Sequence, residues 1–361
     1  MELKFKLLIL IFAVITIPLK THSQQGSDGL FDDPLLVPAK NQEAQLAYNK
    51  GIALFNKGEY EEAIKSFTLS IQYDNNFSKA YVNRGNTYAI LGEYSLALED
   101  LTYAVTNNRT LGSVYYNRGR VFDQMVVRRD SAMNDYNTAI ANNFEDYRVY
   151  YYRGVLFFLL KNYEKAISDL EKCVSLKPDF AYGWNDLGSC YFKLQNYPEA
   201  LRNYYAALSI NPQQSFTYSN IGSVKREQKD YHDAIVQYTM ALNLDSTFQA
   251  VWNNRGCVQF LLENHDKAIE DFKTAISIKD DYAQAYNNVG NSLIKLKKYD
   301  EAITFFNRAI GLNSELGEAY LNRGNAKEMK RDFKGACLDW KQAVTLGVKQ
   351  AGNFSTFCET D

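Results

Sequence analysis

Two stretches of the sequence share one pattern: KAYVNRGNTYAILGEYSLALEDLTYAV at residues 79–105 and QAYNNVGNSLIKLKKYDEAITFFNRAI at residues 284–310. In each, an aromatic residue precedes a glycine by four positions, and an alanine follows that glycine by twelve. The glycine recurs at intervals of 34 residues, with one interval of 35, at Gly51, Gly85, Gly119, Gly154, Gly188, Gly222, Gly256, Gly290 and Gly324. Self-similarity at a fixed period of this length indicates a repeat architecture.

The spacing within one period predicts two helices joined by a short turn. Gly-Glu-Tyr at residues 58–60 and 92–94, and Asn-Tyr at Asn162 and Asn196, predict the turns, because Gly and Asn tolerate the left-handed conformation. Glycine inside a helix costs about 1 kcal/mol relative to alanine. Its recurrence therefore indicates close approach of the two helices, with aromatic side chains filling the space beside them. The predicted fold class is all-α.

These blocks resemble the tetratricopeptide repeat family, in its exported bacterial type, over residues 44–347, which would hold nine repeats. The resemblance implies a right-handed α-solenoid superhelix of antiparallel helix-turn-helix repeats. It also implies a protein–protein interaction scaffold that holds a partner segment on its concave side, which the first helices line. The third repeat departs from the pattern with one extra residue and no Gly or Asn at its turn, which predicts a lengthened loop or a local kink there.

The segments outside the repeats have other roles. Residues 1–23 carry a basic start, an apolar run and small residues before a cut site, so we expect a cleaved signal peptide or, alternatively, an uncleaved anchor. Export would make the protein periplasmic, surface-associated or secreted, without an integral membrane span after cleavage. Residues 24–43 read as a flexible linker, and residues 348–361 as a C-terminal capping helix and tail that cover the last repeat.

Partner binding is expected at first-helix positions three before, one after and four after the repeat glycine, because the resemblance places these positions on the concave face. Aromatic rings and amides there suit an extended peptide, although the aromatic rings could instead pack between first helices. The residues are Asn86, Tyr116, Arg120, Asp123, Tyr151, Phe158, Asn185, Ser189, Phe192, Asn253, Phe260, Asn287, Asn291 and Asn325. The carboxylate clamp of the family also needs lysine three before the glycine. The sequence has Val82, Asn287 and Leu321 there, which argues against such a clamp.

Other function classes find no support in the sequence. A net charge of −2 gives no basic excess for nucleic acid. His232 and His265 lie 33 residues apart without acidic or Cys neighbours at ligand spacing, and no nucleophile elbow or phosphate-binding loop occurs. We therefore expect no enzyme, metal or cofactor. The alternatives are a peptide or cell-envelope glycan receptor, or a regulatory subunit or hydrolase whose chemistry shows no motif.

The cysteines form no Cys-Xaa-Xaa-Cys pair, which excludes zinc ribbons and thioredoxin-type chemistry. Cys173, Cys190 and Cys257 occupy helical repeat positions and are interpreted as small buried residues. Cys337 and Cys358 are predicted to form a disulfide that holds the terminal helix on the last repeat, because a short antiparallel helix would return over Cys337. The competing hypothesis is two free, buried thiols.

The Asn-Arg-Gly motif recurs with Asn83, Asn117, Asn254 and Asn322. We expect these asparagines to satisfy neighbouring backbone groups between repeats rather than to bind a ligand.

Overall fold

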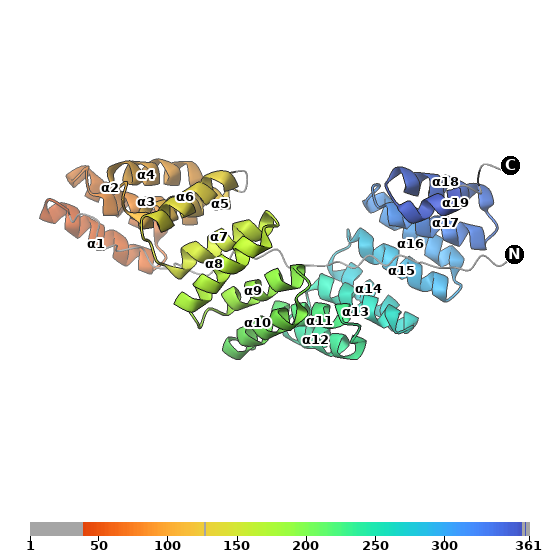
Figure 1. The fold of residues 1–361 in the computed structure, drawn as a ribbon. Helices are drawn as coiled ribbons and strands as arrows, with labels where there is room; N and C mark the ends of the chain where they lie inside the picture. The colour runs from red at the N-terminus through yellow and green to blue at the C-terminus, as the bar shows by residue number, and fades with distance from the viewer. Residues whose placement is uncertain (1–38, 126–127, 356–357, 359–361) are drawn as a thin grey trace. The chain divides into compact units, whose positions relative to one another are not determined.

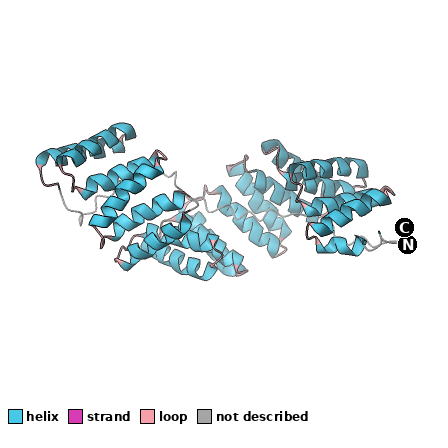
Figure 2. Ribbon diagram, turned by 90° about the horizontal axis from the view of Figure 1, so that it is seen from above, coloured by secondary structure: helices cyan, strands magenta, loops and turns pink. Residues whose placement is uncertain are grey.

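The computed structural model describes residues 39–125, 128–355 and 358, and these residues form helices and turns without strands. Figure 1 shows the helices following one another in sequence order, and Figure 2 shows that short loops join them. The described residues form two compact units, one ending at Asn196 and one beginning at Tyr197. The prediction of an all-α fold is confirmed. The predicted signal peptide and most of the predicted linker lie outside the described residues.

The N-terminal unit contains four helix pairs and the first helix of a fifth. Their bounds are α1 (Gln42–Asn56), α2 (Tyr60–Tyr73), α3 (Ser78–Ile90), α4 (Tyr94–Asn107), α5 (Gly112–Gln124), α6 (Arg129–Ala141), α7 (Tyr147–Leu159), α8 (Tyr163–Leu176) and α9 (Ala181–Lys193).

The C-terminal unit begins with one helix, α10, and contains four helix pairs after it. The bounds are α10 (Tyr197–Ile210), α11 (Ser215–Glu227), α12 (Tyr231–Leu244), α13 (Gln249–Leu261), α14 (His265–Ile278), α15 (Ala283–Lys295), α16 (Tyr299–Leu312), α17 (Gly317–Met329) and α18 (Phe333–Thr345). A 3-10 turn, η1 (Lys349–Ala351), and the short α19 (Gly352–Ser355) follow.

The repeat glycine brings the two helices of a pair close together, as the sequence predicts. A Cβ atom on Gly290 would lie 2.5 Å from Cε1 of Phe306, and one on Gly324 would lie 2.6 Å from Cδ1 of Trp340. Real Cβ contacts are essentially never this short. The aromatic side chain sixteen residues later therefore fills the space that any larger residue at the glycine position would need.

The turn between the helices of a pair needs one residue in the left-handed conformation. Gly58 and Gly92 take it with φ of 80° and 81°, which confirms the prediction for those turns. The prediction is wrong at Asn162 and Asn196, because the left-handed residues are the preceding Lys161 and Gln195. Asn162 instead precedes α8, where its side chain accepts a hydrogen bond from the backbone N–H of Lys165.

The third repeat has the longer connection that its sequence predicts. Four residues separate α5 from α6, whereas three separate α1 from α2. Residues 126–127 lie outside the described part of this connection.

The linker ends earlier than predicted, because α1 begins at Gln42 and includes Glu43. Asn41 caps this helix by accepting a hydrogen bond from the N–H of Ala44 at 2.7 Å. Its Nδ2 also donates to the backbone oxygen of Tyr73, at 2.9 Å. Because Asn41 caps the helix, α1 begins two residues before residue 44, where we expected the repeats to start.

The C-terminal segment covers the last repeat with less helix than predicted. Val348 is extended, so helical structure starts only at Lys349. The ring of Phe354 stacks on Trp340 with centroids 5.2 Å apart. A disulfide joins Cys337 to Cys358, with Cα atoms 5.6 Å apart, as the sequence predicts. Phe357 and the tail after Cys358 lie outside the described residues.

Candidate interaction surface

Several first-helix residues three positions before the repeat glycine join neighbouring repeats. Three of the predicted groove residues are hydrogen-bonded to the side chain two positions before the next glycine, 35 residues further along the sequence. The pairs are Tyr151 with Asp186 (2.9 Å), Asn253 with Asn288 (3.0 Å), and Asn287 with Asn322 (3.1 Å). The prediction that Tyr151, Asn253 and Asn287 face a partner is therefore wrong, since their side chains are buried and used within the solenoid.

The same contacts revise the interpretation of the Asn-Arg-Gly motif. Asn83 donates to the Tyr48 hydroxyl at 2.7 Å, and Asn322 donates to Asn287. These asparagines bind side chains of the preceding repeat rather than its backbone.

Two aromatic residues four positions after the glycine, Phe158 and Phe260, pack inside their own repeats. Phe158 contacts Tyr163 with ring centroids 5.4 Å apart, and Phe260 contacts His265 at 5.0 Å. Both phenylalanines are 8% exposed. Their prediction as groove residues is wrong, because each ring covers the first residue of the following helix.

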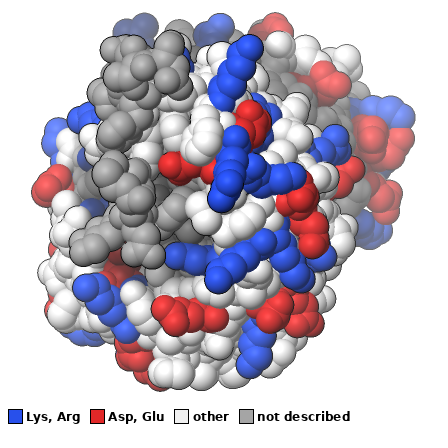
Figure 3. Space-filling view, turned by 90° about the vertical axis from the view of Figure 1, so that its right-hand side faces the viewer, with Lys and Arg blue, Asp and Glu red and all other residues white. Residues whose placement is uncertain are grey.

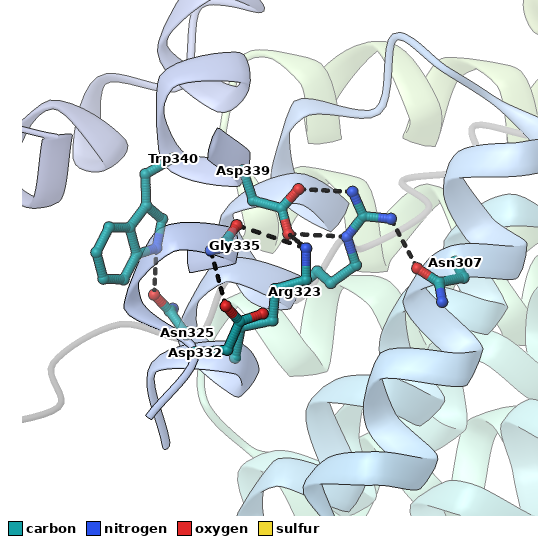
Figure 4. A network of polar contacts seen from close by, with 8 residues as sticks. Asn307, Arg323, Asn325, Asp332, Gly335, Asp339 and Trp340 are labelled. Carbon is teal, nitrogen blue, oxygen red and sulfur yellow. Dashed lines mark hydrogen bonds and ion pairs between the residues drawn. The ribbon is translucent and has the colours of Figure 1, made fainter. Parts of the chain in front are cut away.

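Three of the predicted residues one position after the glycine, Ser189, Asn291 and Asn325, and Asn185 three before it, are also buried. The Trp340 indole N–H donates to Oδ1 of Asn325 at 3.0 Å, as Figure 4 shows. Asn291 is fully buried, and Ser189 donates to the backbone oxygen of Asn185 at 3.1 Å. Asn185 is itself buried and donates to Asp186 at 3.0 Å. Asn185, Ser189, Asn291 and Asn325 therefore do not provide the exposed amide and hydroxyl row that we expected.

The predicted residues that keep solvent exposure lie in the N-terminal unit. Asn86 on α3, Arg120 on α5 and Phe192 on α9 are half-buried. Asp123, one turn beyond Arg120, and Tyr116, one turn before it, are buried, with 9% and 2% of their surfaces exposed, so their prediction as groove residues is wrong. Asn86, Arg120 and Phe192 are the candidate interaction surface.

Arg120 is held on tyrosine side chains. Its guanidinium lies 3.6 Å from the centroid of the Tyr152 ring, and its Nη1 donates to the Tyr116 hydroxyl at 3.1 Å. The fully buried Tyr136 has electrostatic interactions with Arg120 and Asp123. Its hydroxyl has no hydrogen-bond partner among the described residues. Burial raises the pKa of Asp123, while the nearby Arg120 and Arg129 oppose that rise.

Arginine–aspartate pairs connect the helices, and sequence reasoning missed them. Arginine directly before the repeat glycine donates Nε and Nη2 to the aspartate fifteen or sixteen residues after that glycine. The pairs are Arg84–Asp100, Arg118–Asp135, Arg153–Asp169, Arg255–Asp271 and Arg323–Asp339. The recurrence of Arg-Gly with a later Asp is a signal in the sequence that could have identified them.

A third contact extends several of these pairs to the preceding repeat. Figure 4 shows Arg323 between Asp339 and Asn307, whose Oδ1 accepts from Nη1 at 2.7 Å. Thr239 accepts from Nη1 of Arg255 in the same way, at 3.1 Å. The arginine therefore ties its own second helix to the second helix before it. Planar guanidinium groups suit this role because their donors are fixed in a fork.

Asp186 is a buried acid between two first helices. It is 4% exposed and accepts hydrogen bonds from the Tyr151 hydroxyl and the Asn185 amide. Burial raises the pKa of Asp186 to about 7, against the lowering effect of those two bonds. The group therefore changes charge near neutral pH in the folded protein.

The described residues hold neither a cluster of metal-ligating side chains nor a membrane-spanning helix. Among residues 39–125, 128–355 and 358, no group of three or more His, Cys, Asp or Glu could hold a metal ion. No helix in the described part of the protein is long and apolar enough to cross a membrane. On the face in Figure 3, Lys and Arg side chains lie beside Asp and Glu. Cys173, Cys190 and Cys257 are buried and form no disulfide within the described residues.

Comparisons with solved structures agree on the fold. A tetratricopeptide repeat protein from Parabacteroides merdae ATCC 43184 has a TM-score of 0.53 and 19% identity, covering 70% of this chain and 100% of that chain. A chain of the APC/C hetero-tetramer Cut9–Hcn1 has a TM-score of 0.53 and 13% identity, covering 87% of this chain and 75% of that chain. PilF of Pseudomonas aeruginosa has a TM-score of 0.51 and 19% identity, covering 55% of this chain and 91% of that chain. No curated protein matches the sequence.

Sequence profiles identify the repeats directly. Profiles described as tetratricopeptide repeat match residues 44–77, 147–180, 179–247, 250–282 and 283–316, which together are more than half of the chain. The 34-residue period, the paired helices and the glycine contacts agree with these matches. The chain belongs to the tetratricopeptide repeat family.

Proposed function

We propose that this protein is an exported, non-enzymatic scaffold that holds a segment of a partner protein against its first helices. Repeats of this family form interaction scaffolds, and the first helices here keep a small set of the expected groove residues open to solvent. The observation that carries the proposal is the candidate interaction surface, whose Asn86, Arg120 and Phe192 remain half-buried while the other predicted groove residues are buried.

Two features support the absence of catalysis and the export. The polar residues buried between repeats are engaged in helix-to-helix contacts rather than gathered into an acid–base or nucleophile arrangement. The basic start and the apolar run within residues 1–23 support export. Sequencing the N-terminus of the protein from its native cell tests export, with Gln24 expected as the first residue. A soluble cytosolic protein that starts at Met1 would refute it.

Site-specific photo-crosslinking tests the binding surface. A photoreactive amino acid at position 86 or 192 should give one covalent partner adduct in the native cell, because these positions lie on the first helices. The matched control is position 96, where Leu96 is 42% exposed on the second helix α4. An adduct from position 96 alone would move the binding surface to the second helices. Absence of adducts from all three positions would contradict a scaffold function in the N-terminal unit.

A further inference from the structure

Arginines that are shielded from solvent in this protein bind carboxylates through one edge of the guanidinium. In the five repeat pairs, Nε and Nη2 both donate to an aspartate. Arg148 binds Asp146 through the same edge, and Arg226 binds Glu227. This edge presents two parallel N–H groups that match the two oxygens of a carboxylate.

Arg120 is the exception among the described arginines. It is half-buried, and its Nε and Nη2 donate to no described residue. The other described arginines without a carboxylate on this edge are all exposed: Arg109, Arg128, Arg129, Arg308 and Arg331. Asp123 does not fill the edge, since no ion pair joins it to Arg120.

The open edge is held in place by its surroundings. Stacking on Tyr152 fixes the plane of the guanidinium, and the bond from Nη1 to Tyr116 fixes its rotation. A side chain that is already immobilised loses little entropy when it binds, which favours a ligand. The hydroxyl of Tyr136 nearby adds an unsatisfied hydrogen-bonding group that is fully buried.

The local charge also favours an anion. Residues 109–153 contain seven Arg, no Lys and five acidic residues. Three of the acids, Asp135, Asp146 and Glu145, already lie in ion pairs. The whole protein, by contrast, has a net charge of −2.

We propose that Arg120 binds a carboxylate of the partner segment, either an acidic side chain or a free C-terminal carboxylate, through Nε and Nη2. This proposal rests on the proposed scaffold function and names the group that the surface recognises. It differs from a lysine-based clamp, because one arginine braced by two tyrosines supplies both donors. Asp123 lies beside the site and opposes the ligand's charge, so replacing it with asparagine should strengthen binding.

The probes are four short peptides that differ only in carboxylates. Acetyl-tetra-alanine with a free C-terminus and acetyl-Ala-Glu-Ala-Ala-amide each carry one. Acetyl-tetra-alanine amide and acetyl-Ala-Gln-Ala-Ala-amide carry none. The full-length protein is labelled with ¹⁵N-arginine, and the Nε–H resonance of Arg120 is assigned as the one lost in Arg120→Lys. We expect at least one carboxylate peptide to shift this resonance, with the Nε–H resonance of Arg84, whose edge is occupied, unchanged.

Variants measure the contribution of the edge. Arg120→Lys keeps the charge but loses the fork, so a fluorescent version of the bound peptide should bind about tenfold more weakly or worse. Arg308→Lys, at an exposed arginine, is the matched control and should bind like the natural protein. Asp123→Asn should bind more tightly.

Two results would overturn the proposal: equal shifts from the neutral amide peptides, or no shift of the Arg120 resonance at millimolar carboxylate peptide. The comparison with the neutral amide peptides is measured on the natural protein, so it does not depend on the folding of a variant. If partner adducts at positions 86 and 192 persist while the Arg120 resonance stays unchanged, the scaffold function stands and the carboxylate site is wrong. A shift from the peptide with a free C-terminus alone assigns a terminal carboxylate, and a shift from the glutamate peptide alone assigns an acidic side chain.

Discussion

Replacing Arg255 with methionine should open the seventh repeat locally. Arg255 donates to Asp271 at 3.0 and 2.7 Å and to Thr239 at 3.1 Å, and the Asp271 side chain is only 6% exposed. Removing one partner of a buried ion pair costs about 3 to 5 kcal/mol, because a charge is left without compensation. Arg255 is 18% exposed, so water reaches the edge of this pair and we expect a loss of about 3 kcal/mol.

Hydrogen exchange followed by mass spectrometry is the appropriate assay. Repeat arrays unfold locally as well as globally, so a single melting temperature does not isolate one repeat. Amides of α13 and α14 should exchange about a hundredfold faster in Arg255→Met, whereas amides of α17 and α18 should change little. The double variant Arg255→Met, Asp271→Asn should lose less than the sum of its two single variants, by about 2 kcal/mol, because both charges are gone.

A control separates a shielded pair from an exposed one. Arg202 forms an ion pair with Glu199, and their side chains are 72% and 36% exposed, respectively. Arg202→Met should therefore cost less than about 1 kcal/mol. A loss in Arg255→Met no larger than that of Arg202→Met, or full additivity in the double variant, would refute the role of these pairs in joining helices.

Three further predictions follow from single positions. Between about pH 4 and pH 7 the folded protein should hold a proton on Asp186 that the unfolded protein lacks, so the free energy of unfolding should fall by up to roughly 4 kcal/mol as pH rises through that window. Asp186→Asn should remove this pH dependence in denaturation experiments at pH 5 and pH 8. An unchanged pH dependence in the variant would contradict a raised pKa of Asp186. Lys297→Gly should stabilise the protein by about 0.5 to 1 kcal/mol in urea titrations, because Lys297 has a φ of 62°. Lys295→Gly, at the last residue of α15, should instead destabilise it by about 1 kcal/mol. A stabilising Lys295→Gly together with a destabilising Lys297→Gly would contradict the turn assignment. Cys358→Ser should release the C-terminal segment from α18 and lower the free energy of unfolding by on the order of 3 kcal/mol, because the disulfide closes a loop of 21 residues. If mass mapping of the oxidised natural protein finds that Cys358 reacts with an alkylating reagent, the disulfide is contradicted.

The period of the glycines was sufficient to predict the fold, because most of these glycines contact a large apolar or aromatic side chain sixteen or seventeen residues later. Gly290 with Phe306 and Gly324 with Trp340 show this contact. The exact turn residues could not be read in the same way. The left-handed residue lies two positions before the first residue of the second helix whether or not the residue between them caps that helix, as Lys161 before Asn162 and Lys297 before Lys298 show.

The binding positions were predicted less well than the fold. Placing Asn253 and Asn287 on a first helix was correct, but the register could not show that the next repeat supplies a hydrogen-bonding partner for each. That contact depends on the rotation between successive repeats, which is a property of the packed solenoid. Arg120 stands out only when its open edge is compared with the occupied edge of Arg84 or Arg255, and such a comparison needs atomic positions.

The most direct test of a scaffold that binds through its first helices is the yield of partner captured by the triple variant Asn86→Ala, Arg120→Gln, Phe192→Ala. The variant and the natural protein are expressed in the native cell, cross-linked and purified, and the partner is quantified by mass spectrometry relative to the bait. We predict at least a tenfold loss of partner with unchanged helical circular dichroism, because these side chains are partly open to solvent and lie outside the arginine–aspartate pairs that join the helices. Undiminished capture by a folded triple variant would contradict the account.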